Sequence, residues 1–100
     1  MPNYRTLDNL DEDYFQNHPG EIGPYLDELF EAFAQDNDAG ALLASLRTVA
    51  RVKGMSTIAE EIGMSRQGLQ KALSVNGNPR LESVNAIMRA LGYRLAPQKL

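Results

Sequence analysis

The sequence predicts an all-α fold, a bundle of five helices preceded by an acidic N-terminal arm. Apolar residues recur at spacings of three and four along successive segments, which is the period of amphipathic helices. Gly, Asn, Asp, Ser and Pro separate these segments, and these residues begin or end helices. With 43% hydrophobic residues, the 100-residue chain can bury one compact core. We expect an arm at residues 1–18, a helical domain at 19–96 and a tail at 97–100.

The arm carries Tyr4, Leu7, Leu10 and Tyr14 at helical spacing, enough for a short amphipathic helix. Four acidic residues between positions 8 and 13 crowd this segment with negative charge. We therefore expect the arm to be weakly ordered until a partner binds it.

Two longer helices open the domain. The apolar stripe of the first helix falls between residues 22 and 33, with Pro24 in the first turn of the helix and Gly23 just outside it. Asp38 is expected to cap the second helix, which stops at Gly54.

Two short helices follow. Ser56 is expected to cap a helix over residues 57–62, which Gly63 ends. Ser65 then caps the next helix, which runs through Leu73.

A turn over residues 75–79 precedes the fifth helix, and positive φ is expected at its Gly and Asn residues. The fifth helix carries an apolar stripe over residues 81–91 and ends at Gly92, which tolerates the left-handed conformation. Residues 93–96 alternate like a short strand, which Pro97 cuts off.

Residues 55–73, MSTIAEEIGMSRQGLQKAL, predict a helix-turn-helix motif. Ala59 is small enough for the two helices to cross closely, and Gly63 opens the turn where a side chain would be strained. The residues expected to point inward are Ile58, Ile62, Met64, Leu69 and Leu73. In such a motif the second helix lies in the major groove of DNA.

Four polar residues of the second helix have no role in the core and are expected to read DNA bases: Arg66, Gln67, Gln70 and Lys71. The N–H groups at the start of this helix, next to Ser65, suit a phosphate or a base edge. The competing interpretation is a helical bundle whose polar face is only solvated.

The chain also resembles a known family. The segments LRTVARVKGM, NGNPRLESV and ALGYRL, around the motif, are similar to HigA-like probable addiction module antidote proteins of the Xre-type helix-turn-helix family. The resemblance extends from about residue 18 to residue 95 and implies a lambda-repressor-like fold. It further implies a bacterial type II toxin–antitoxin module, in which the protein neutralises a RelE/ParE-like toxin and represses its own operon.

The resemblance also implies roles for individual residues. Arg66 and Gln67 match the start of the family's recognition helix, and Lys71 lies one turn further on. The positions expected to contact phosphate are Ser56, Thr57, Ser65, Asn76, Asn78 and Arg80. Gly68 departs from the family pattern, which often has a larger residue there, and glycine weakens a helix by roughly 1 kcal/mol.

The net charge of −3 conceals two different halves. Residues 1–40 hold ten Asp and Glu against Arg5, whereas residues 41–100 hold nine Lys and Arg against three Glu. This asymmetry predicts different partners, and the partner of the basic half is expected to be polyanionic. Chance and solvated helix faces are the alternative explanation.

The acidic half suits a basic toxin, which it would cover by folding upon it. Its expected anchors are Tyr4, Leu7, Tyr14 and Phe15; the alternative is an uncoupled tail that aids solubility. A homodimer on a palindromic operator is expected to pair through Leu91, Tyr93 and Leu95.

Several classes of function are not expected. The chain has no Cys and a single histidine, His18, so we expect no metal site, no cofactor and no catalytic residue. No apolar run is long enough to span a membrane and the N-terminus lacks a signal layout, so we expect a cytoplasmic bacterial protein. Two alternatives stay open: a stand-alone Xre-type repressor without a toxin, and a protein-interaction module that has lost DNA binding.

Overall fold

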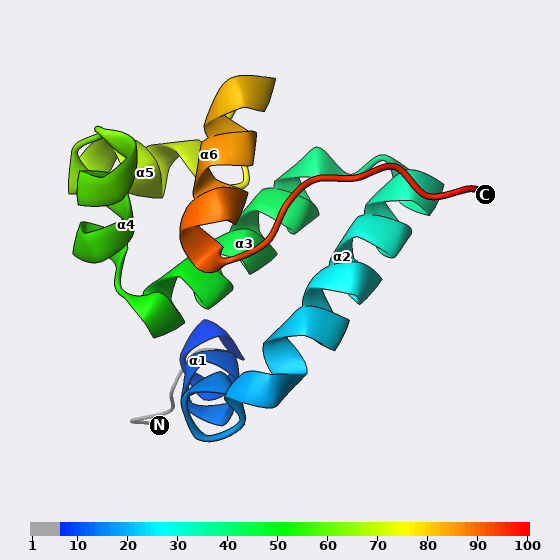
Figure 1. The fold of residues 1–100 in the computed structure, drawn as a ribbon, viewed down its shortest axis with the longest axis horizontal. Coiled ribbons are helices and arrows are strands. Elements are labelled where there is room, and N and C mark those ends of the chain that lie inside the picture. Colours follow the sequence, from blue (N-terminus) through cyan, green and yellow to red (C-terminus); the bar gives the residue numbers. More distant parts are fainter. Residues whose placement is uncertain (1–6) are drawn as a thin grey trace.

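The computed structural model describes residues 7–100, with side chains from residue 11 onward. It contains six α-helices and one 3₁₀-helix in this range: α1 (Leu7–Asn17), η1 (Pro19–Glu21), α2 (Ile22–Asp36), α3 (Ala39–Lys53), α4 (Met55–Ile62), α5 (Arg66–Ala72) and α6 (Leu81–Leu91) (Figure 1). No strand occurs between residues 7 and 100, so the all-α class is confirmed. No helix in that range combines the length and the apolar character needed to cross a bilayer.

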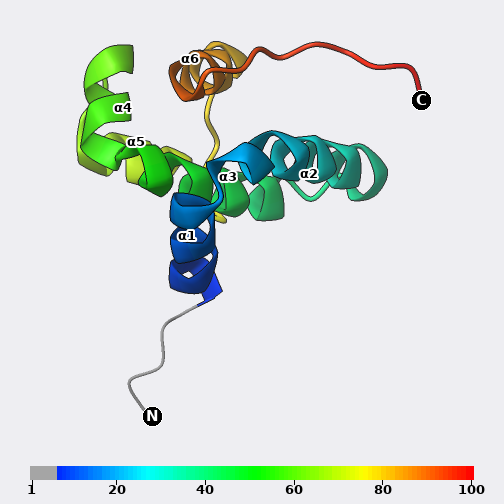
Figure 2. The same ribbon diagram turned by 60° about the horizontal axis from the view of Figure 1, so that its bottom comes forward.

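Helix α3 lies at the centre of the fold. Figure 1 shows α2 on one side of it and α4 and α5 on the other, and Figure 2 shows α1 below it. Its residues Leu46 and Ala50 are completely buried, together with Ile58 of α4, Leu69 of α5 and Ile87 of α6. One apolar core therefore joins the helices on both sides of α3.

Local capping explains where most helices begin and end. Asp38 Oδ1 accepts the Ala41 N–H at 3.0 Å at the start of α3, as expected. Gly63 and Gly92 have φ values of 74° and 95° and end α4 and α6, which is the role that the sequence predicted for them.

Two predicted helix starts are wrong. Helix α4 begins at Met55, and its N-cap is Gly54, so Ser56 lies inside the first turn and caps nothing. Because Gly54 with a φ of 115° ends α3 and begins α4, no residue is left between the two helices to act as a separate cap. Gly23 lies within α2 instead of outside it, because α2 begins at Ile22 directly after η1.

The turn between α5 and α6 uses glycine for a different reason from the expected one. None of residues 75–79 has a positive φ. Instead, a Cβ at Gly77 would lie 2.2 Å from the carbonyl oxygen of Ala72, so only glycine lets the turn approach the end of α5.

The short strand expected after α6 does not form. Residues 93–96 have no regular structure. The Tyr93 N–H instead bonds the Met88 carbonyl at 2.9 Å, which turns the chain back, and Leu95 packs against the core. A strand also needs a neighbouring strand, and residues 7–100 contain none.

The helix expected in the acidic arm is present as α1, which packs on α3. Phe15 is buried, with its ring centroid 4.7 Å from that of Tyr25 in α2. Gln16 Nε2 donates a hydrogen bond of 3.3 Å to the Val52 carbonyl near the end of α3. Helix α1 therefore has a defined place beside α3.

Candidate nucleic-acid interface

Helices α4 and α5 form a closely packed pair joined by a three-residue turn. The Met64 N–H bonds the Ala59 carbonyl at 2.9 Å, and Gly63 adopts the left-handed conformation between them. Ser65 Oγ then accepts the Gly68 N–H at 2.9 Å and caps α5, as the sequence predicted. The turn is thus held by backbone bonds on one side and by a side-chain cap on the other.

Gly68 lies beside this cap. A Cβ at position 68 would lie 3.0 Å from Ser65 Oγ and 3.7 Å from Met64 Cε. A larger residue would crowd the capping hydroxyl. Glycine therefore leaves room for the cap while lowering the intrinsic helix propensity of α5.

The residues expected to read bases occupy the surface of α5. Arg66, Gln67 and Lys71 are exposed, whereas Gln70 is half-buried. Ser56 and Thr57, expected to contact phosphate, are exposed in the first turn of α4. Arg66 Nη1 lies 3.4 Å from Ser56 Oγ and donates to it. A residue expected to read bases therefore contacts one expected to bind phosphate.

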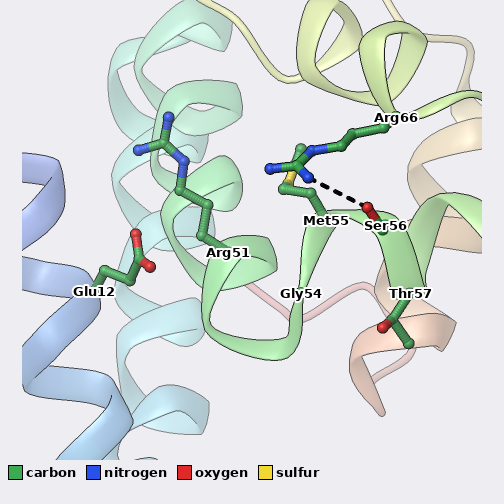
Figure 3. Close-up of a pocket in the computed structure, with 7 residues that line it drawn as sticks. All are labelled: Glu12, Arg51, Gly54, Met55, Ser56, Thr57 and Arg66. Carbon is green, nitrogen blue, oxygen red and sulfur yellow. Dashed lines mark hydrogen bonds between the residues drawn. The ribbon is translucent and has the colours of Figure 1, made fainter.

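A pocket of about 410 Å³ lies where α1, α3, α4 and α5 come together. Figure 3 shows Arg51 of α3 and Arg66 of α5 at this pocket, with Ser56 next to Arg66 and Glu12 on α1; Thr57 also lines the pocket, but its side chain points away from the arginines. Arg51 was not among the predicted site residues, because it lies in the last turn of α3, outside the motif. Only folding brings it near Arg66.

The remaining expected phosphate contacts lie elsewhere. Asn76, Asn78 and Arg80 are exposed in the segment between α5 and α6, and none of them lines the pocket. Arg80 is the N-cap residue of α6 and makes no side-chain cap. Of the predicted DNA-contacting residues, only Ser56, Thr57 and Arg66 line the pocket. The others lie at the start and on the surface of α5 or in the segment that follows it.

The expected toxin anchors have different surroundings. Tyr4 lies outside the described residues, and Leu7 begins α1 but its side chain is outside the described part. Tyr14 is 43% exposed, and its phenol donates a 2.6 Å hydrogen bond to Glu21 Oε2. This bond, with desolvation and the nearby negative charge, raises the pKa of Tyr14 above its ordinary value. Phe15 is buried against the domain, so a partner cannot reach it while α1 is docked.

The expected dimer residues surround the end of α6. Tyr93 is 38% exposed, and a Cβ at Gly23 of α2 would lie 3.4 Å from its phenol oxygen. Leu91 and Leu95 are half-buried because they pack against the core of the same chain. Only part of their apolar surface is left for another subunit.

These features define a small all-helical protein in which polar and cationic side chains cover one short helix of a close pair. Residues 6–99 match the family model described as "Probable addiction module antidote protein". The chain belongs to this family. An antidote of an addiction module acts against a toxin, so membership supports an antitoxin role and implies a toxin as partner.

A relative from Haemophilus influenzae is 39% identical over 79 residues, which are 79% of this chain and 77% of the relative. It is described as an uncharacterized protein. No solved structure matches the chain.

Proposed function

We propose that the chain is a DNA-binding antitoxin of a type II toxin–antitoxin module, which neutralises a RelE/ParE-like toxin and represses its own operon. In this proposal α4 and α5 act as a lambda-repressor-like, Xre-type helix-turn-helix, and α5 enters the major groove of a palindromic operator. The protein acts in the bacterial cytoplasm.

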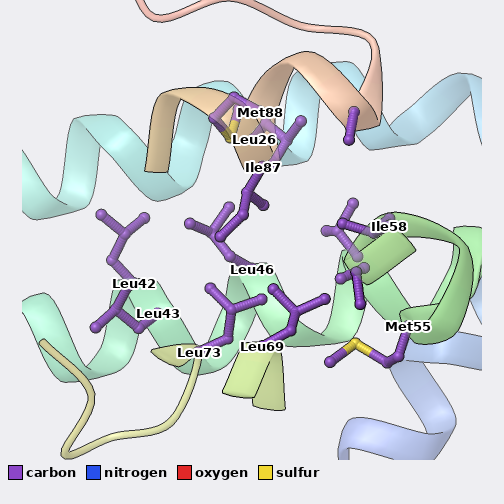
Figure 4. Packing of buried hydrophobic residues seen from close by; sticks show 14 residues of the cluster. Leu26, Leu42, Leu43, Leu46, Met55, Ile58, Leu69, Leu73, Ile87 and Met88 are labelled. Carbon is purple, nitrogen blue, oxygen red and sulfur yellow. The ribbon is translucent and has the colours of Figure 1, made fainter. Parts of the chain in front are cut away.

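The observation that carries the DNA-binding part is the separation of two faces on α5. Leu69 and, directly after the helix, Leu73 are completely buried and point toward Leu46 of α3 (Figure 4). Arg66, Gln67 and Lys71 are left exposed. A short helix held only by its inner face can present donors to base edges without disturbing the core.

The base-reading role is tested by Arg66→Ala in a mobility-shift assay with the DNA upstream of the gene. We expect a loss of about 1–3 kcal/mol on this DNA and a much smaller loss on a random duplex. Lys99→Ala is the control, because Lys99 is exposed in the tail beyond α6 and its removal changes the net charge equally. An equal loss on both duplexes would contradict base reading by Arg66.

The toxin-binding part rests on family membership and on the acidic first half of the chain. RelE-like toxins are basic, so opposite charge would favour and orient the encounter. The test is a pull-down of the tagged protein from its host, with co-purifying species identified by mass. A stoichiometric small basic protein supports the antitoxin, whereas recovery of the chain alone, still able to shift its promoter, supports a stand-alone repressor.

A homodimer would place two α5 helices about one turn of DNA apart. We propose Leu91, Tyr93 and Leu95 as its contact surface, with Tyr93 the most accessible of the three. Sedimentation of wild type and Tyr93→Ala tests this surface. A chain that binds no duplex at all would instead support a module specialised for protein interaction.

A further inference from the structure

The pocket between α1, α3, α4 and α5 contains charges of both signs. Arg51 and Arg66 reach it from α3 and α5, and Glu12 reaches it from the acidic helix α1 (Figure 3). Glu12 is half-buried, whereas the acidic residues Asp27, Glu28 and Glu31 of α2 are exposed. Glu12 is therefore distinguished from these acids by its position and not only by its charge.

We infer that this pocket binds one backbone phosphate of DNA between Arg51 and Arg66, and that Glu12 competes with the phosphate there. This inference rests on the proposed DNA-binding function and adds Arg51 as a phosphate-binding residue and α1 as an element that lowers DNA affinity. Its ligand is a phosphodiester of duplex DNA.

The chemistry of the pocket suits a phosphodiester. Guanidinium groups bind phosphate oxygens through paired N–H donors, and two of them from different helices enclose one anion. Ser56 and Thr57 line the same pocket, and the Ser56 hydroxyl, 3.4 Å from Arg66 Nη1, is a neutral group that can donate to a phosphate oxygen. A phosphate bound here would lie next to Arg66, and the exposed face of the same helix, α5, carries the other proposed base-reading residues.

The fold fixes Glu12 near this position. Phe15, three residues later and on the same face of α1, is buried against the domain. Gln16 donates a hydrogen bond to the carbonyl of Val52, the residue that follows Arg51 near the end of α3. Because α1 is docked at these points, the Glu12 carboxylate stays on the lining of the pocket, where it repels an incoming phosphate.

The experiment compares full-length Glu12→Gln with Glu31→Gln. Both variants remove one negative charge, but Glu31 is exposed on α2, which lies across α3 from α4 and α5 (Figure 1). Affinity for the DNA upstream of the gene is measured at salt concentrations from about 50 to about 200 mM. Each phosphate contact releases about one counterion, so the affinity falls steeply as salt rises over this range. We expect Glu12→Gln to bind about two- to fivefold more tightly than wild type, and Glu31→Gln to differ little from it.

Arg51→Gln completes the test. It should weaken binding and reduce the salt slope by about 1, as loss of one phosphate contact does. In the Arg51→Gln background, Glu12→Gln should lose most of its effect, because the two residues act on the same site. Thermal unfolding by circular dichroism checks that each variant is folded.

The outcomes separate this inference from the proposed function. If wild type binds the duplex while Glu12→Gln and Glu31→Gln bind equally well, or Arg51→Gln keeps its full salt slope, the inference is overturned and DNA binding stands. If wild type binds no duplex, the proposed DNA-binding function fails and this inference fails with it.

Discussion

Among single residues, Ser65 and Ser56 offer a matched pair, because both were predicted to cap helices and only Ser65 does so. Replacing Ser65 with Ala leaves the Gly68 N–H without its acceptor at the start of α5, which should lower the free energy of unfolding by about 1 kcal/mol. Ser56→Ala removes only an exposed 3.4 Å contact with Arg66 and should cost less than about 0.5 kcal/mol. Urea denaturation measures both, and equal costs would contradict the capping assignment.

Gly77 is the glycine of the turn over residues 75–79, and we expect its replacement to destabilise the fold. Gly77→Ala would bring a methyl group to 2.2 Å from the Ala72 carbonyl oxygen, so the turn has to move. We expect a loss of about 1–3 kcal/mol in the free energy of unfolding. Gly20→Ala is the control, because its Cβ meets nothing within 4 Å and should change stability by less than about 0.5 kcal/mol. A similar loss at both positions would argue against the close approach.

Tyr14 should titrate above its ordinary pKa of about 10, because its phenol donates to the Glu21 carboxylate. A pKa that is raised in the folded state contributes stability below the unfolded pKa, and this contribution is lost as the pH rises through the folded pKa. Alkaline titration followed by phenolate absorbance, with Tyr14→Phe subtracted, measures the shift. In Glu21→Gln the pKa should fall back toward 10, and a pKa unchanged by that substitution would rule out the Glu21 bond as its cause.

The residues that sequence analysis assigned correctly have local physical reasons. Asp38, Ser65 and Gly92 act within one helical turn of their own position, so the neighbouring sequence was sufficient to place them. The roles of Gly77 and Arg51 depend on other elements, because a Cβ at Gly77 would meet a carbonyl at the end of α5 and Arg51 lines a pocket together with Arg66 of α5. No spacing pattern in the sequence contains that information.

At the scale of elements, α1 is a helix whose two neighbouring aromatic residues face different surroundings. Phe15 is 6% exposed and Tyr14 is 43% exposed. Phe15→Ala should lower the free energy of unfolding by about 3 kcal/mol through lost burial, whereas Tyr14→Ala should cost less than about 1 kcal/mol. Urea denaturation of both variants checks this, and a small cost for Phe15→Ala would mean that α1 does not stay docked in solution.

This difference also determines how a toxin-binding role of α1 is examined. Deleting residues 1–17 removes Phe15 from the fold along with any partner contact, so the two effects would be mixed. Tyr14→Ala leaves Phe15 in place and removes the exposed ring together with its hydrogen bond to Glu21. The helix itself was predictable from apolar spacing, whereas its docking on α3 was not, because the partners Tyr25 and Val52 lie in other segments.

At the scale of the whole molecule, Lys53 joins three helices at the end of α3. Its ammonium donates to the Ala90 carbonyl in the last turn of α6 and lies 3.9 Å from Glu61 Oε1 of α4. A cation suits the end of α6, where carbonyl groups leave a partial negative charge. The all-α class and the order of the domain's five helices followed from the sequence, but this joining of α3, α4 and α6 did not, because it depends on how the helices pack.

The placement of α2 on one side of α3, with α4 and α5 on the other, has an electrical consequence (Figure 1). The acidic residues lie mostly in α1 and α2, and the basic ones in α3 and beyond, so the molecule has a permanent electric dipole moment. In about 0.01 M salt the Debye length is about 30 Å, and molecules should attract one another with opposite sides facing. At about 0.15 M salt, where that length is about 8 Å, the attraction should fade and light scattering should give a lower apparent mass.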